Sequence, residues 1–127
     1  MRTQVTRLEG ISGETRGLIV PILLNGTKMC SMAIDTMASH SFIDPKVFDF
    51  PEIPGEELEM HTAFGFKKCP KLDVKTLTFD EHEFQIDGVY ALSLPGQYFS
   101  GLLGWDILDR FKGFMYLRGT QMDFYEK

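Results

Sequence analysis

The sequence predicts a mostly-β fold, a closed or folded barrel of short strands with one short helix in the C-terminal half. Three observations support this prediction. Short segments rich in β-branched and aromatic residues recur along the chain, separated by Gly, Pro, Asn and Asp. One late segment, Trp105 to Phe111, has the apolar spacing of a helix. Strands do not alternate with helices, which excludes a parallel α/β sheet.

Length and charge restrict the organisation and the partners. The chain has 127 residues, enough for one domain with a buried core, and 1–127 is treated as a single domain. Its net charge is −5 and its longest Lys/Arg cluster is Lys67-Lys68, so we expect no nucleic-acid partner. It has no apolar run of membrane-span length, and its N-terminus is too polar for a signal peptide. We therefore expect a cytoplasmic protein, although a chain that starts after a cleaved leader would look the same.

The cysteines and histidines do not form a metal-binding pattern. Cys30 and Cys69 are far apart and lack C-x-x-C spacing, which favours two reduced thiols over a zinc site or a disulfide. Glu81-His82-Glu83 is interpreted as a solvated turn, because adjacent residues of an extended chain point in opposite directions. The sequence therefore predicts no metal and no cofactor.

The first elements are expected to be antiparallel strands. Residues 1–16 suggest an outer strand or hairpin arm with a polar turn at 12–14. Leu18 to Leu24 is β-rich and stops at Asn25-Gly26, a pair suited to the positive φ angles of a hairpin turn. Pro21 must then occupy an edge or an unpaired position, because it has no N–H to donate.

Asp35 stands at the end of the returning strand, Thr27 to Thr36. Because strand side chains alternate, Asp35 faces away from the more apolar row formed by Cys30, Met32 and Ile34. An acid flanked by apolar residues is poorly solvated unless it is paired, and is therefore a candidate for chemistry. The alternative is an Asp that closes a turn by bonding its own backbone, and this stretch alone favours that alternative.

The rest of the chain is predicted as short strands, turns and one helix. Asp44-Pro45 should cap a short helical turn through Phe48. The remaining predictions are, in chain order, a solvated connection at 49–59, a hairpin from Met60 to Lys67 with Gly65 at its tip, a strand at 74–79, a turn at 80–83, a strand from Phe84 to Tyr90, a loop from Leu92 to Ser100, an apolar run from Gly101 to Gly104, a helix from Trp105 to Phe111 ended by Lys112-Gly113, and a terminal hairpin from Phe114 to Tyr125.

Two motifs at this separation resemble the retropepsin-like aspartic protease family. The first is Asp35-Thr36-Met37-Ala38-Ser39, which follows an Asn25-Gly26 hairpin and precedes Phe42-Ile43. The second is Leu102-Leu103-Gly104-Trp105-Asp106-Ile107-Leu108, with an aromatic-glycine hairpin between the two. The resemblance covers about Ile19 to Phe124, and it implies a retropepsin-like fold.

The resemblance also implies a function and a set of site residues. Asp35 would be the catalytic carboxylate, and since the chain has one such turn, a homodimer would pair two copies of it. The dimer would act as an endopeptidase on an extended polypeptide, without metal or cofactor. The supporting residues implied for the catalytic loop are Thr36, which would lock the two loops together, Met37, Ala38, Ser39, Leu102, Leu103 and Gly104, and those implied for a flap over the substrate are Ala63, Phe64, Gly65 and Phe66.

Met37 departs from the family, which has glycine at this position. A glycine lets the backbone approach a ligand closely, whereas Met37 puts a flexible thioether near the cleft. Three interpretations remain open: an active endopeptidase with a reshaped subsite, a silenced peptide-binding or assembly module, and an unrelated small barrel in which Asp35 caps a turn. The terminal hairpin also differs from the single final strand of the viral enzymes, so a four-stranded terminal dimer sheet is not assumed.

Overall fold

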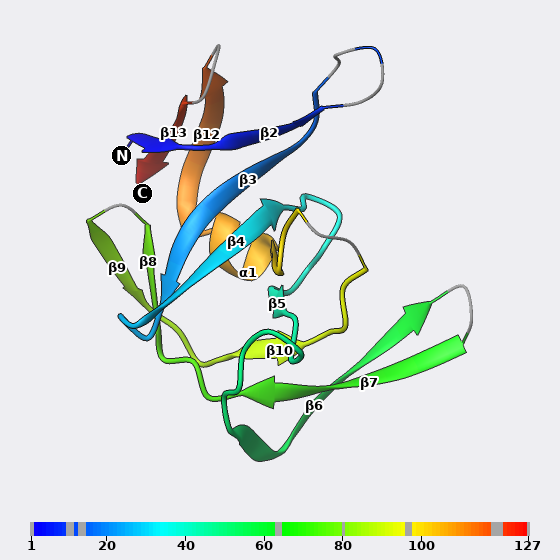
Figure 1. Cartoon of the computed structure of the whole chain (residues 1–127). Helices are drawn as coiled ribbons and strands as arrows, with labels where there is room; N and C mark the ends of the chain where they lie inside the picture. The colour runs from blue at the N-terminus through cyan, green and yellow to red at the C-terminus, as the bar shows by residue number, and fades with distance from the viewer. Residues whose placement is uncertain are drawn as a thin grey trace.

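The computed structural model describes residues 2–9, 12, 15–62, 65–79, 81–95, 98–117 and 121–126, and this part of the chain is mostly β (Figure 1). The predicted fold class is therefore confirmed. The elements are β1 (Arg2–Gln4), β2 (Thr6–Glu9), β3 (Thr15–Leu24), β4 (Lys28–Ile34), β5 (Phe42–Ile43), β6 (Glu52–Thr62), β7 (Gly65–Leu72), β8 (Thr76–Phe79), β9 (His82–Gln85), β10 (Val89–Ala91), β11 (Gly101–Leu103), α1 (Trp105–Leu108), β12 (Phe111–Leu117) and β13 (Gln121–Glu126).

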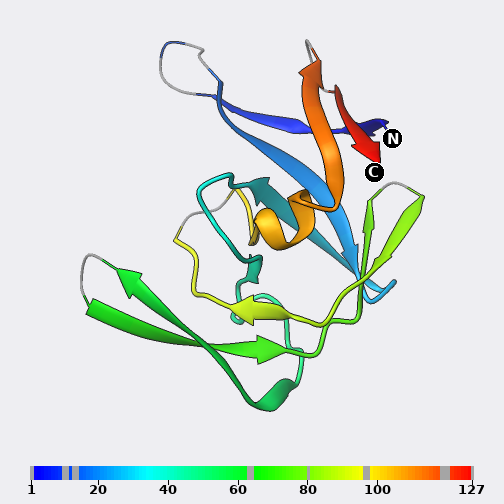
Figure 2. The ribbon, with the colours of Figure 1, turned by 180° about the vertical axis from the view of Figure 1, so that it is seen from behind.

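The strands form a large sheet and a smaller terminal sheet. The large sheet has the order β6-β7-β10-β5-β11-β4-β3-β8-β9, with β2 also paired to β3, and the terminal sheet has the order β1-β13-β12. The terminal sheet lies at one end of the molecule and the β6–β7 hairpin at the other, with α1 between them (Figures 1 and 2). α1, the helix of the described residues, is too short to span a membrane.

Strand β11 brings together the two motifs that the sequence separates. It pairs in parallel with β4, with Leu103 opposite Ile34, and antiparallel with β5, with Leu102 opposite Phe42. The loop that joins β4 to β5 therefore leaves the sheet on one side of β11 and returns on the other. This loop begins with Asp35, so its position depends on pairing between distant parts of the chain.

Aromatic packing joins the terminal hairpin to the large sheet. The ring of Phe124 in β13 lies 5.7 Å from that of Phe79 in β8 and 5.0 Å from that of Phe111 in β12, measured between ring centroids. Each such pair contributes about 0.5–1.5 kcal/mol beyond the burial of its area. The most deeply buried large side chains, spread over both sheets and α1, are Phe79, Phe124, Ile22, Leu24, Met32, Ile43, Leu77, Leu103, Leu108 and Met122.

The first predicted hairpin is confirmed. Strands β3 and β4 pair across a turn in which Asn25 and Gly26 have φ angles of 51° and 68°. The Asn25 side chain accepts a hydrogen bond from Lys75 N–H at 2.7 Å, which holds the turn against the segment before β8. Along β3, the pairing with β2 ends at Ile19 and the pairing with β8 begins at Ile22. Pro21 lies between these two paired segments, where the edge of β3 away from β4 is unpaired, as predicted.

The prediction of a solvated connection at 49–59 was wrong, because most of it is strand β6. Gly55 has a φ of 79°, and the pairing with β7 shifts register between Glu52 and Glu57. The shift takes up Pro54 and Gly55, which would interrupt a regular strand. β6 is an edge strand, and its glutamates remain exposed. The composition therefore indicated the exposure correctly and the secondary structure incorrectly.

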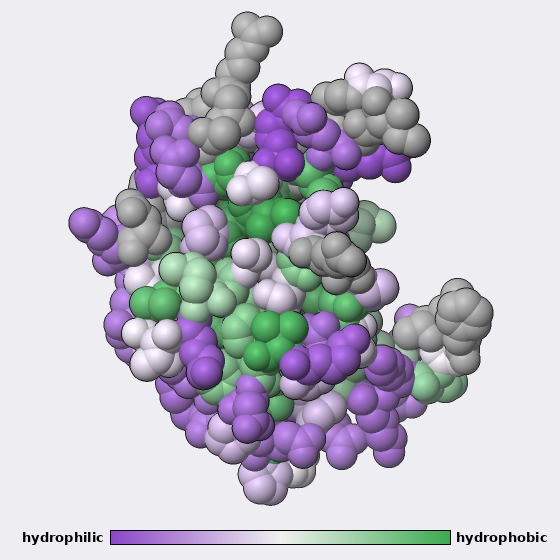
Figure 3. Space-filling model, viewed as in Figure 1, coloured by the Kyte–Doolittle hydropathy of each residue, from purple (hydrophilic) through white to green (hydrophobic). Residues whose placement is uncertain are grey.

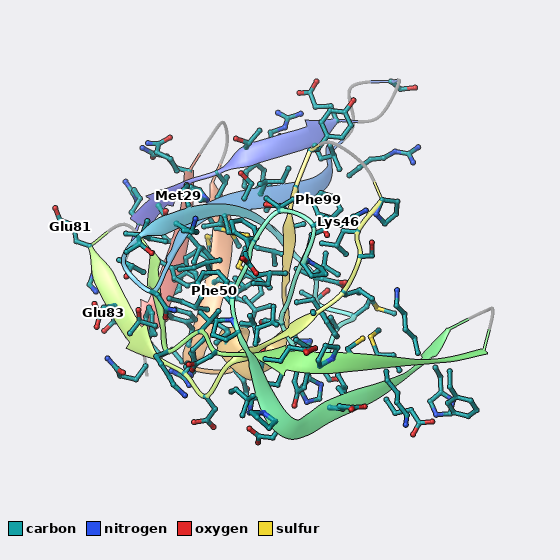
Figure 4. The ribbon with its side chains drawn as sticks, turned by 60° about the horizontal axis from the view of Figure 1, so that its bottom comes forward. Met29, Lys46, Phe50, Glu81, Glu83 and Phe99 are labelled. Atoms are coloured by element: carbon teal, nitrogen blue, oxygen red, sulfur yellow. The ribbon has the colours of Figure 1, made fainter. Side chains whose placement is uncertain are left out.

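Two further boundaries differ from the prediction. The turn at 80–83 was predicted too long, because His82 already begins β9; Glu81 and Glu83 point away from the body of the molecule (Figure 4). The single strand predicted from Phe84 to Tyr90 is two strands, separated around Gly88, whose φ is 144°. A side chain at Gly88 would approach the Leu72 carbonyl to 2.8 Å, so the break requires glycine.

The helix is shorter than predicted. It ends at Leu108, and Phe111 begins β12, which has a register shift between Phe111 and Gly113. Phe111 has helical spacing in the sequence, but in the structure it belongs to a strand and packs against β8 and β13 from there. The predicted terminal hairpin is confirmed for β12 and β13, and its turn at 118–120 lies outside the described residues. Asp44 caps a single turn as predicted, because its Oδ1 accepts Lys46 N–H at 2.9 Å.

We predict that both cysteines of the folded protein resist thiol reagents. Cys30 and Cys69 are free and fully buried, and burial raises the pKa of the Cys30 thiol to about 11 and also raises that of Cys69. Because the thiolate is the reactive form, labelling with an aromatic disulfide at pH 8 should be slow in buffer and should reach two thiols per chain in denaturant. Rapid labelling of either thiol in the native protein would contradict the packing described.

Candidate active site

Asp35 begins the loop that leaves the end of β4. Its backbone N–H donates to the Leu103 carbonyl at 3.0 Å, and its own carbonyl accepts Ala38 N–H at 3.2 Å. Its carboxylate Oδ1 accepts the Met37 N–H at 3.0 Å. The turn-closing bond that the stretch alone favoured is therefore present. The same bond gives the carboxylate one fixed orientation at the head of the loop.

The start of α1 holds the loop from beneath. The Trp105 and Asp106 backbone N–H groups donate to the carbonyls of Ala38 and Ser39 at 2.9 and 3.1 Å. The first N–H groups of a helix have no partner within the helix, so the loop carbonyls satisfy them. The indole Nε1–H of Trp105 donates to the Thr36 carbonyl at 2.6 Å. Three carbonyls of the loop are thus bound by two consecutive residues.

A buried serine completes the attachment of the loop. Ser41 is fully buried; its N–H and Oγ–H donate to the two carboxylate oxygens of Asp106 at 2.9 and 2.6 Å. Its Oγ also accepts the Gly104 N–H at 3.0 Å. A β-carbon at Gly104 would lie only 2.4 Å from the His40 carbonyl oxygen, so glycine is required for this close approach. The structure therefore places Gly104 directly against the loop.

The β11 residues named by the second motif lie beneath the same loop. Leu103 is fully buried and its carbonyl binds Asp35 N–H, whereas Leu102 is half-buried between Ala33 and Phe42 in the sheet. Asp106 belongs to the second motif, but the sequence predicted no role for its side chain and did not identify Ser41 as a site residue. Ser41 and Asp106 are separated by 65 positions, and no pattern in the sequence links them.

The flap-like hairpin is formed by β6 and β7. Gly65 has a φ of 111° and pairs with Thr62, so it begins β7. Phe66 is 67% exposed, and its ring centroid lies 4.2 Å from that of His61 across the hairpin. Ala63 and Phe64, also predicted for the flap, lie outside the described residues. The hairpin reaches beyond the body of the molecule (Figures 1 and 2).

A cavity of about 250 Å³ lies between the loop and this hairpin. The surface is hollowed on this side, between the β2–β3 hairpin and the β6–β7 hairpin (Figure 3). Sequence reasoning missed the β6 residues of the cavity, because Leu58 fell within the segment predicted as a connection; the alternation of Leu58 and Met60 with glutamate was the available signal. The cavity is lined by Met37, Ala38, Ser39 and Phe42 on the loop side and by Leu58, Glu59, Met60 and His61 on the hairpin side.

Met37 points out of the loop without straining it. Among the described residues, Asn25 is the one non-glycine residue with a positive φ, so Met37 has an ordinary backbone conformation. Its side chain is 93% exposed and lines the cavity. Met37 therefore contributes a thioether to the cavity wall from an unstrained backbone.

The histidine next to the motif has a packing role. His40 is half-buried, its ring meets that of Tyr90 edge to face at 5.4 Å, and its Nδ1 forms a hydrogen bond with Ser39 Oγ at 2.9 Å. It lines a second, polar cavity of about 270 Å³ with Lys71, Asp87 and other residues. In the described part of the chain, no three His, Cys, Asp or Glu side chains gather in a way that could hold a metal ion.

We predict that Ser41→Ala lowers the free energy of unfolding by about 1–3 kcal/mol, because it leaves the buried Gly104 N–H without its acceptor and removes a bond to a charged carboxylate. Urea denaturation followed by circular dichroism measures the change. Ser93→Ala, at an exposed loop serine, is the matched control and should stay within about 0.5 kcal/mol of wild type. Equal stability of the two variants would contradict the role given to Ser41.

Comparison with known proteins agrees with this geometry. The sequence model of a family described as aspartyl protease matches residues 20–107, more than half of the chain. No curated protein matches the chain by sequence. The structure is similar to the crystal structure of a retropepsin-like aspartic protease from Rickettsia conorii, with a TM-score of 0.60 and 19% identity, covering 98% of this chain and 92% of that one. At that identity the structural likeness shows the fold. The chain therefore belongs to the aspartyl protease family and has the retropepsin-like fold.

Proposed function

We propose that this protein is an aspartic endopeptidase that hydrolyses peptide bonds in an extended polypeptide, with Asp35 as the catalytic carboxylate. The observation that carries the proposal is the placement of Asp35 at the head of a loop whose residues Met37, Ala38 and Ser39 line a cavity between the loop and the projecting β6–β7 hairpin. The carboxylate is oriented by Met37 N–H, and the loop is fastened to β11 and α1. Membership of the family supports the same chemistry.

We propose further that the active form is a homodimer. Aspartic protease chemistry needs two carboxylates a few ångströms apart, and each chain contributes one Asp35 loop. Exposed apolar side chains beside this loop support a covering partner, because Met37 is 93% and Trp105 41% exposed. The β1-β13-β12 sheet forms within one chain, so a dimer sheet made by exchanging terminal strands is not needed to pair these strands.

In the proposed dimer, the two Asp35 carboxyl groups share one proton, because two charges so close repel each other. The ionised group takes a proton from a water molecule, and the water oxygen attacks the peptide carbonyl carbon. The protonated group donates its proton to the carbonyl oxygen. The tetrahedral intermediate then collapses: the carboxyl group that took the proton of the water gives it to the amine nitrogen as the C–N bond breaks, and a hydroxyl of the intermediate returns a proton to the other carboxylate as the C=O re-forms. Thr36 to Ser39 would position these groups, and the β6–β7 hairpin would cover the substrate, with Ala63 to Phe66 as the flap residues predicted from the sequence.

We predict that Asp35→Asn abolishes cleavage while the fold is retained. An amide cannot share or transfer the proton, but it can still accept the Met37 N–H through its carbonyl oxygen. Cleavage of a library of unstructured peptides, read by mass spectrometry, measures the loss; wild type should be fastest at acidic to mildly acidic pH. Asp49→Asn, at an exposed aspartate, is the control. Undiminished proteolysis by Asp35→Asn would contradict the assignment of Asp35 as the catalytic carboxylate.

We predict that Met37→Gly keeps activity and alters the preferred peptides, because it removes a thioether from the cavity wall and no positive φ has to be relieved. The same peptide library measures the preference, and Met115→Ala, at another exposed methionine, controls for loss of a surface thioether. If wild type is inactive and Met37→Gly cleaves peptides, the proposal that the natural chain is active is wrong, and the protein is a silenced protease. Peptide binding without cleavage by both proteins would identify a binding module instead.

A further inference from the structure

We propose that Trp105 is a positioning residue for the catalytic loop, and this inference rests on the proposed function of Asp35. Trp105 is the single tryptophan of the chain and the first residue of α1. Its indole Nε1–H donates to the Thr36 carbonyl at 2.6 Å, within the reach of a strong hydrogen bond. The side chain therefore binds the residue immediately after Asp35.

The bonds of Trp105 and Asp35 meet on one peptide group. The Thr36 carbonyl and the Met37 N–H are opposite ends of the same planar peptide unit, which rotates as a rigid body. The carbonyl end accepts the indole N–H, and the N–H end donates to Asp35 Oδ1 at 3.0 Å. Hydrogen bonds in such a chain polarise one another in the same direction. Trp105 thus sets the orientation of the donor that orients the carboxylate.

The backbone of Trp105 holds the other side of Met37. Its N–H donates to the Ala38 carbonyl at 2.9 Å, so the indole and the backbone together bind the residues before and after Met37. The Ala38 N–H in turn donates to the Asp35 carbonyl. The short segment that carries the exposed Met37 side chain is therefore clamped at both ends by one residue.

Aromatic packing fixes the indole itself. Its ring centroid lies 6.3 Å from that of Phe114 in β12, and Phe114 lies 5.8 Å from the fully buried Phe124 in β13. A line of three rings thus joins the loop to the core of the terminal hairpin. Because Trp105 is 41% exposed, its hydrogen bond contributes more to orientation than to the stability of the core.

The test compares Trp105→Phe, which keeps an apolar ring and loses the N–H donor, with Tyr125→Phe, which removes one polar group from an aromatic residue of nearly equal exposure, 42%. In Trp105→Phe we expect kcat to fall roughly 10- to 100-fold with a much smaller change in KM, because the carboxylate is misoriented while the β6 side of the cavity is untouched. We also expect the Met37 and Ala38 amides to exchange with solvent about tenfold faster or more, measured by NMR. Tyr125→Phe should change neither quantity.

The exchange measurement separates this inference from the proposed function. Unchanged exchange at Met37 and Ala38 in Trp105→Phe overturns the positioning role whatever the activity, and so does faster exchange with wild-type kcat. If wild type cleaves no peptide, the proposed function fails, and exchange in the two variants still decides whether Trp105 orders the loop. Should Trp105→Phe not fold, the wild-type indole N–H gives one resonance in the spectrum. Exchange of that N–H as fast as in free indole overturns the inference.

Discussion

The hydrogen bonds between Ser41, Asp106 and Gly104 are the interaction on which the site depends. The loop from Asp35 to Ser41 contains no strand or helix, and its own bonds from the Met37 and Ala38 N–H groups to Asp35 close only its first turn. Ser41 is fully buried, and a polar group there is costly unless it is bonded. The Asp106 carboxylate accepts hydrogen bonds from the Ser41 N–H and Oγ–H, and the Ser41 Oγ accepts the Gly104 N–H. The loop that begins with Asp35 is thereby held to β11 and α1, next to the cavity.

Met37 combines an unstrained backbone with a side chain that lines the cavity. Its backbone does not adopt the positive φ that only glycine takes easily, and its N–H still reaches the Asp35 carboxylate. Its flexible thioether lines the cavity together with Met60 and Leu58. A thioether adapts its shape to what it contacts. In the proposed protease, Met37 would therefore act on the shape of the cavity rather than on the integrity of the loop.

Much of the fold was predictable, because strong local patterns agreed with the tertiary structure. Asn25-Gly26 between two β-rich segments predicted the β3–β4 hairpin, but the second strand was predicted two residues too long, because β4 ends at Ile34 and Asp35 follows it. β6 was missed because a register shift absorbs Pro54 and Gly55, which locally argue for a loop. The helix was predicted too long because Phe111 has helical spacing while its burial comes from packing in a strand.

The sequence by itself determined the strands around Asp35, the turn it closes and the family to which the chain belongs, because these follow from motifs a few residues long. Only the tertiary structure decided what holds that turn. The bonds of Ser41 to Asp106 and of Trp105 to Thr36 join residues more than 60 positions apart. They exist because β11 pairs in parallel with β4 and brings the two motifs together. Local preferences do not specify such pairing, which depends on the packing of the whole domain.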